Sequence, residues 1–96
     1  MTTTEPRKHS RRPVRMQTPV FDTRTGEFVH GSSRDLSMGG AFVETPSVLP
    51  VGTLVELFVG GVGIGVQVLG RIVHVVPGQG FGVSFTQEAA SLANLL

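Results

Sequence analysis

The sequence predicts a small all-β domain in which about six strands form a barrel and one helix follows them. Apolar residues recur at every second position in short runs, which is the period of a half-buried strand. Turn-forming residues among the 13 glycines and six prolines separate these runs. The chain has 96 residues and no cysteine, so we expect one core that folds without disulfides or cysteine-bound metals.

Each predicted strand is bounded by residues typical of turns. The first strand ends before the turn-forming residues 22–26, and Pro46 ends the third because proline cannot donate a hydrogen bond to a ladder. The fifth and longest is apolar on both faces, which suits the closed wall of a barrel, and Gly70 marks a bend in it. The six predicted strands are residues 16–21, 27–31, 41–45, 54–59, 66–76 and 81–85.

The apolar period changes near the C-terminal end. Thr86 is a suitable helix N-cap, and Leu92 and Leu96 fall on one helical face together with two alanines. We therefore expect a barrel over about residues 16–86 and a helix over about 87–96 that packs on the barrel or on a partner.

The net charge of +1 divides unevenly along the chain. Residues 1–15 carry five lysines and arginines against one glutamate, a net charge of +4, whereas residues 16–96 carry three arginines against six carboxylates, a net charge of −3. A basic arm before a mildly acidic body indicates an anionic ligand, although a solvated tail has the same composition. Residues 1–10 lack apolar periodicity, so we expect them to be a flexible basic leader.

Catalytic and metal-binding patterns are sparse in this sequence. His9, His30 and His74 are scattered and lack the spacing of metal ligands. The glycines at 60–65 lack the spacing of a dinucleotide loop, and Lys8 is the only lysine, which excludes a GxxxxGK phosphate loop. We expect no catalytic residues, no metal and no cofactor, so an enzyme is the function class that the sequence supports least.

No segment has the pattern of a membrane span or a secretion signal. The longest apolar stretch, 51–76, is interrupted by charged and polar residues and by six glycines. The first ten residues are polar and charged with no apolar run behind them. We expect a cytoplasmic protein.

Two polar clusters interrupt the strand pattern where loops are expected. The first, residues 10–15, supplies three guanidinium groups from Arg11, Arg12 and Arg15. Guanidinium groups are planar forks suited to phosphate oxygens and to the O6/N7 edge of guanine.

The second cluster is residues 34–40. Asp35 offers a carboxylate that can accept hydrogen bonds from the Watson–Crick donors of guanine, and Ser37 adds a hydroxyl. Gly39 and Gly40 allow a tight turn of the backbone. Each cluster alone fits a solvated tail or an ordinary Asx turn, but together they offer cations for phosphate and polar groups for guanine.

These clusters resemble the signature of the PilZ domain, a bacterial receptor module for the second messenger cyclic di-GMP. That signature is RxxxR followed by (D/N)xSxxG; residues 11–15 are RRPVR and residues 35–40 are DLSMGG. Residues 80–85, GFGVSF, are similar to the last barrel strand of the family. The resemblance covers about residues 11–85 and implies a six-stranded antiparallel barrel with a C-terminal helix, a PilZ domain over 11–96. A second RxxxR at 7–11 overlaps the first, and we prefer 11–15 because it abuts the first strand.

The resemblance also implies a ligand site. The motif arginines would hold phosphates and guanine edges, the aspartate and serine would hold a guanine base, and the final glycine would supply the turn. One further arginine lies inside the first motif and is a third cation that the pattern does not require. The implied residues for cyclic di-GMP are Arg11, Arg12, Arg15, Asp35, Ser37 and Gly40.

The function predicted from this site is that of a non-enzymatic cyclic di-GMP receptor. Its arginine arm becomes ordered on the ligand and signals to an unidentified protein partner. The alternative is an adaptor of the same fold that binds a protein without cyclic di-GMP. A barrel for single-stranded nucleic acid is less well supported, because the body is acidic and the chain has no tryptophan or tyrosine for stacking. We expect no DNA or RNA partner, and the oligomeric state stays open.

Overall fold

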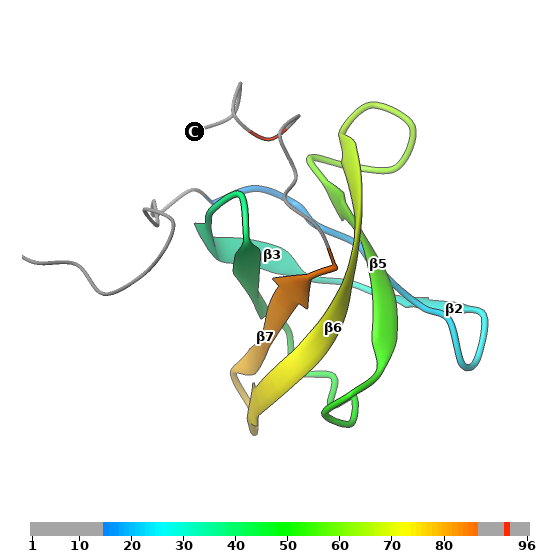
Figure 1. Ribbon diagram of the computed structural model, residues 1–96, viewed down its shortest axis with the longest axis vertical. Helices are drawn as coiled ribbons and strands as arrows, with labels where there is room; N and C mark the ends of the chain where they lie inside the picture. Colours follow the sequence, from blue (N-terminus) through cyan, green and yellow to red (C-terminus); the bar gives the residue numbers. More distant parts are fainter. Residues whose placement is uncertain (1–14, 87–91, 93–96) are drawn as a thin grey trace, which may run out of the picture.

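The computed structural model describes residues 15–86 and Leu92. Seven strands form one antiparallel sheet in the order β2-β1-β5-β6-β7-β4-β3 (Figure 1). The strands are β1 (Val20–Asp22), β2 (Glu27–Val29), β3 (Ser32–Leu36), β4 (Gly40–Glu44), β5 (Leu54–Val59), β6 (Val66–Val76) and β7 (Gly80–Phe85).

The sheet is not closed, and β2 and β3 are its two edges. The segment just before β1, residues 16–19, nevertheless contacts two distant parts of the sheet. The amide of Thr18 donates to the carbonyl of Gly31 next to β3, and the amide of Gly60 after β5 donates to the carbonyl of Gln17, both at 2.8 Å. The predicted closed barrel is thus an open sheet in which one isolated bridge, at Gln17, reaches the β3 edge.

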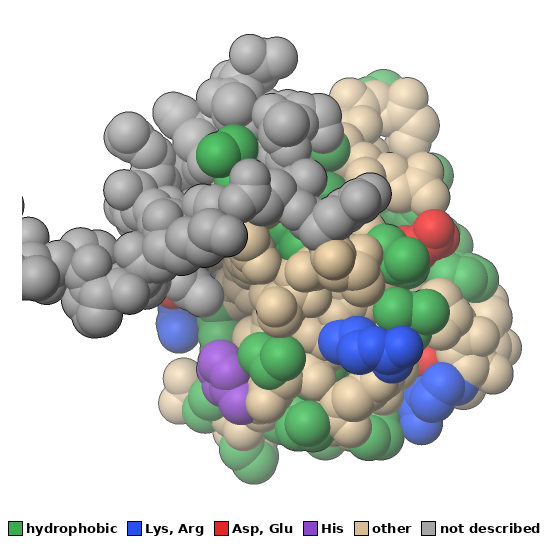
Figure 2. Space-filling model, viewed as in Figure 1, with side chains coloured by type: hydrophobic (Ala, Val, Ile, Leu, Met, Phe, Trp, Pro, Cys, Tyr) green, Lys and Arg blue, Asp and Glu red, His purple; other side chains and the backbone are tan. Residues whose placement is uncertain are grey.

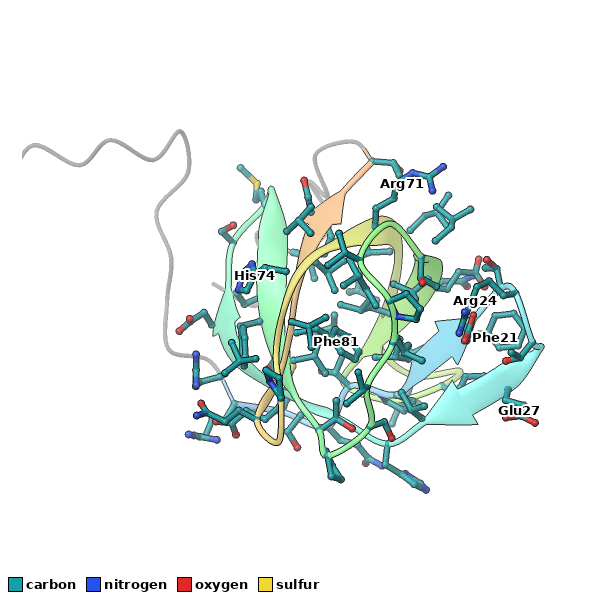
Figure 3. The ribbon with its side chains drawn as sticks, turned by 90° about the horizontal axis from the view of Figure 1, so that it is seen from below. Phe21, Arg24, Glu27, Arg71, His74 and Phe81 are labelled. Carbon is teal, nitrogen blue, oxygen red and sulfur yellow. The ribbon has the colours of Figure 1, made fainter. Side chains whose placement is uncertain are left out.

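The core lies on the concave side of this curved sheet. Alternate residues of β5 are fully buried, as its apolar period predicts, and β4 and β7 are buried along most of their lengths. Phe81 of β7 is among the largest fully buried side chains and lies among the curving strands (Figure 3). Leu92 is also fully buried against this core.

The prediction of six strands missed β3. We expected residues 34–40 to be a loop, but Arg34, Asp35 and Leu36 belong to a strand at the edge of the sheet. Its residues are mostly polar because it pairs on one side only, and a bulge between Ser33 and Asp35 breaks the two-residue alternation. A bulged, polar edge strand does not have the periodicity by which the other strands are identified.

Two predicted segments lie outside the described residues. They are the leader, residues 1–10, and the C-terminal helix, residues 87–96, of which Leu92 alone is described. Among the described residues, no helix is long and apolar enough to cross a membrane.

The turn between β1 and β2 depends on a buried carboxylate. Asp22 is only 2% exposed, and its Oδ1 accepts hydrogen bonds from the Arg24 amide at 2.9 Å and from Arg24 Nε at 3.2 Å. Its Oδ2 accepts a third from Arg24 Nη2 at 2.8 Å. Hydrogen bonding to the Arg24 side chain lowers the pKa of Asp22, against the opposing effect of burial.

Because of this pKa shift, the stability of the fold should depend on pH. Because the pKa of Asp22 is lower in the folded chain, its stabilisation is fully present above the unfolded-state pKa of about 4 and is lost as pH falls below it. The difference in free energy of unfolding between wild type and Asp22→Asn should be largest at neutral pH and shrink in acid. Urea unfolding across pH 3–7 measures it, with Glu27→Gln on the same hairpin as control. A difference that stays constant with pH would contradict the assignment.

Candidate functional site

The second predicted motif forms the turn between β3 and β4. Ser37 is buried, and its Oγ accepts hydrogen bonds from the amides of Gly39 and Gly40, each at 3.2 Å. The same hydroxyl donates to the carbonyl of Gly40 at 3.2 Å, and the Ser37 amide donates to that carbonyl at 2.9 Å. Ser37 therefore fixes the conformation of the loop that we predicted would hold guanine.

Gly40 is required by the packing of the sheet. A Cβ at this position would lie 2.5 Å from the carbonyl oxygen of Val83 on β7, too close for any side chain. Next to it, the carbonyl of Gly39 accepts a hydrogen bond from the amide of Phe85 at 2.9 Å. The motif glycines thus lock the turn against β7.

Asp35 and Arg15 lie within electrostatic reach of each other. Asp35 is half-buried on β3, where it pairs with Phe42, and Arg15 is exposed two residues before Gln17, which forms an isolated bridge to Ser32. Glu44 is the main cause of the raised pKa of Arg15, and the Asp35 carboxylate adds a smaller electrostatic contribution. One residue from each predicted motif is thus electrostatically linked to the other.

Glu44, at the end of β4, is the direct partner of Arg15. Arg15 Nη1 donates to Glu44 Oε1 at 2.6 Å, and Nη2 donates to Oε2 at 3.5 Å, so the guanidinium meets both carboxylate oxygens. This pairing raises the pKa of Arg15 and lowers that of Glu44. Both groups are therefore charged at neutral pH.

Arg34 is the fourth charged residue of this part of the surface. Its Nη1 lies 3.8 Å from Glu44 Oε2, and its Cζ lies 4.0 Å from the centroid of the Phe42 ring. The ring of Phe42 is in turn 6.0 Å from that of His74, with an angle of 31° between the planes. We call Arg15, Arg34, Asp35, Phe42 and Glu44 the β3–β4 cluster.

Our sequence interpretation missed three members of this cluster, namely Arg34, Phe42 and Glu44. Phe42 and Glu44 are two residues apart on β4, so strand periodicity alone places them on one face. Arg34 precedes Asp35 directly and would be expected on the opposite face without the bulge in β3. Of the predicted site residues, Arg11 and Arg12 lie outside the described residues, and Arg15, Asp35, Ser37 and Gly40 are placed at or beside the β3–β4 cluster.

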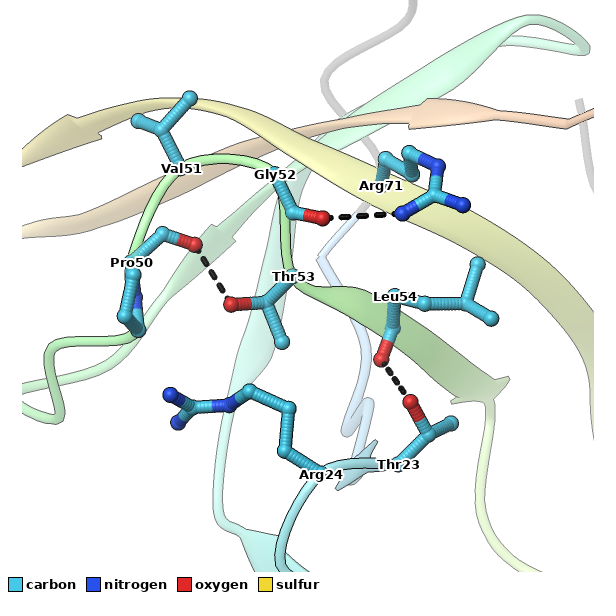
Figure 4. Close-up of a pocket in the computed structure, with 8 residues that line it drawn as sticks. All are labelled: Thr23, Arg24, Pro50, Val51, Gly52, Thr53, Leu54 and Arg71. Atoms are coloured by element: carbon cyan, nitrogen blue, oxygen red, sulfur yellow. Dashed lines mark hydrogen bonds between the residues drawn. The ribbon is translucent and has the colours of Figure 1, made fainter.

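A separate hollow of about 470 Å³ lies between the β1–β2 turn and the turn before β5 (Figure 4). Polar side chains that line it donate hydrogen bonds to backbone carbonyls of other lining residues. Arg71 Nη1 donates to the carbonyl of Gly52 at 3.0 Å, and Thr53 Oγ1 donates to that of Pro50 at 2.7 Å. Arg24 is bound to buried Asp22. Arg15 and residues 35–40, the described members of the two motifs, do not line this hollow.

The charged surface of the described residues is divided into small groups. Figure 2 shows arginine side chains at separate places on the visible face, with hydrophobic side chains and other uncharged atoms between them. A continuous basic stripe, which single-stranded nucleic acid requires, is not seen on this part of the surface. Within residues 15–86 and Leu92, no three His, Asp or Glu side chains gather as metal ligands would.

Comparison with known proteins identifies a family and a similar solved structure. The family model described as the PilZ domain matches residues 5–96. The structure is similar to the crystal structure of the PilZ domain of CeSA from a cellulose-synthesizing bacterium, with a TM-score of 0.65 and 27% sequence identity over 85% of each chain. No curated protein matches the chain.

The hydrogen bonds of Ser37 give a prediction for stability. Ser37→Ala removes a hydroxyl and leaves the amides of Gly39 and Gly40 without that acceptor, which should lower the free energy of unfolding by about 1–3 kcal/mol. Urea denaturation measures the loss. Ser84→Ala, an exposed serine on β7, is the matched control and should change stability by less than about 0.5 kcal/mol. Equal effects of the two substitutions would show that Ser37 does not hold the turn.

Proposed function

The chain belongs to the PilZ domain family, whose members are generally receptor modules for cyclic di-GMP, and we propose that it binds this dinucleotide without catalysing a reaction. The observation that carries the proposal is that Arg15 is bound to Glu44 on β4, the strand that pairs with β3 and its Asp35, while Ser37 and Gly40 hold the turn between these two strands. The motif residues among them come from both halves of the signature. Their proximity is what a ligand with both phosphate and guanine groups requires.

Arg15 supports the phosphate half of this proposal. Its guanidinium already meets both oxygens of a carboxylate, and phosphate oxygens accept the same pair of hydrogen bonds. It is exposed, so a ligand reaches it without unfolding the sheet. In the proposal, Arg11 and Arg12 precede it on the same arm and close over the ligand. The arm becomes ordered when the ligand binds.

Asp35 supports the guanine half. The Watson–Crick edge of guanine presents N–H donors, and a carboxylate is an acceptor for two of them. Asp35 lies on a strand that is paired to β4, and the adjoining turn is held by Ser37 and Gly40. The acceptor is therefore positioned by a rigid part of the sheet, which reduces the ordering cost of binding.

The proposal also includes how ligand binding is signalled to a partner. Ordering of residues 11–15 over the ligand would create a new surface beside β3 and β4, which a protein partner would recognise. The setting we propose is second-messenger signalling in the bacterial cytoplasm. A PilZ domain that docks its partner without cyclic di-GMP is the alternative outcome.

Calorimetry with cyclic di-GMP tests the proposal. Wild type should bind cyclic di-GMP in preference to GMP or GTP. Arg15→Ala and Asp35→Ala each remove a charge-assisted hydrogen-bonding group and should weaken binding on the order of 10- to 100-fold. Arg71→Ala and Glu27→Ala, outside the cluster, are the matched controls and should leave the affinity unchanged.

Two results would contradict the proposal in different ways. Unchanged affinity in both Arg15→Ala and Asp35→Ala would reject the site. Absence of binding to wild type would reject the receptor function, and a protein partner whose capture does not respond to added cyclic di-GMP would then favour the adaptor.

A further inference from the structure

The carboxylate of Glu44 lies between two guanidinium groups, at 2.6 Å from Arg15 and 3.8 Å from Arg34. We propose that Glu44 occupies the place of a ligand phosphate, and that Arg34 is a further ligand-binding residue outside the family signature. When the ligand binds, its phosphate displaces Glu44 from both arginines. This inference rests on the proposed function, because the displacing group is a phosphate of cyclic di-GMP.

Arg34 is held in position before any ligand arrives. Its guanidinium lies 4.0 Å from the centroid of Phe42, a distance at which a cation is attracted to the ring face. Phe42 is only 4% exposed and its ring lies near His74. The imidazole of His74 packs so closely over Gly82 that a Cβ at Gly82 would come within 2.3 Å of it.

The bulge in β3 explains how Arg34 comes to share a face with this ring. Regular pairing would point Arg34 and Asp35 to opposite faces of the sheet. The register shifts between Ser33 and Asp35, so Arg34 has no regular partner on β4. The extra residue places Arg34 and Asp35 on the same face of the sheet.

Glu44 and a phosphate compete for the same hydrogen bonds. Arg15 donates to Glu44 through both of its terminal Nη groups, and a guanidinium bound end-on to a carboxylate cannot offer the same two N–H donors to a phosphate. The negative charge of Glu44 would also repel a phosphate from the cluster. Both effects weaken binding, and because the groups are exposed to solvent the expected effect is a modest adjustment of affinity.

Substitutions of Glu44 and Arg34 should change the affinity for cyclic di-GMP in opposite directions. Glu44→Gln keeps the size of the side chain but removes its charge, so calorimetry with cyclic di-GMP should show affinity about 3-fold tighter. Arg34→Gln removes a phosphate-binding group and should weaken binding about 10-fold. In the Glu44→Gln background, Arg34→Gln should still weaken binding, which separates a ligand contact from a role in holding Glu44.

Matched controls come from the same sheet. Glu56→Gln changes a carboxylate on β5 that accepts a hydrogen bond from Gln67 at 2.9 Å, and Arg71→Gln changes an exposed arginine on β6. Both should leave the affinity unchanged. Arg34→Lys keeps the charge without the planar fork and should fall between wild type and Arg34→Gln. A thermal unfolding curve for each variant shows that it is folded at the temperature of the titration.

The outcomes separate this inference from the proposed function. If wild type binds and Glu44→Gln does not bind more tightly, the role of Glu44 is overturned. If Arg34→Gln has no effect, or none in the Glu44→Gln background, Arg34 is not a ligand-binding residue. If neither wild type nor Glu44→Gln binds cyclic di-GMP, the proposed function fails and this inference fails with it.

Discussion

The close contact between β4 and β7 is the constraint on which the candidate site depends. Side chains are excluded at both ends of this contact, because a Cβ at Gly40 would lie 2.5 Å from the Val83 carbonyl and one at Gly80 would lie 2.0 Å from that of Val43. Fixed there, β4 carries Phe42 and Glu44 outward beside β3. β3, which carries Arg34 and Asp35, pairs with β4 and is thereby attached to the core of the domain.

The strands that were predicted correctly are those in which the pattern of apolar residues follows the pattern of burial. β5 alternates buried and half-buried residues, and β6 begins and ends at the predicted residues. β3 was missed because an edge strand with a bulge carries polar residues that are typical of loops. That the sheet is open and not a closed barrel could not be predicted from periodicity, since it depends on how residues 16–19 meet both β3 and β5.

The site was predicted in part for a similar reason. Spacing within each motif was visible in the sequence, and it identified Asp35, Ser37 and Gly40 together. Their local roles differ, because Ser37 and Gly40 shape the turn while Asp35 lies on the strand before it. The link between Arg15 and Glu44 joins residues 29 positions apart, and only the pairing of strands creates it.

The central claim is that the ligand meets the β3–β4 cluster, and amide chemical shifts test it most directly. A titration of the ¹⁵N-labelled chain with cyclic di-GMP should move the amide signals of residues 34–40 and 42–44. The signals of residues 23–24, 51–54 and 71 around the separate hollow should stay in place. Shifts confined to the hollow, or no shifts at saturating ligand, would contradict the account.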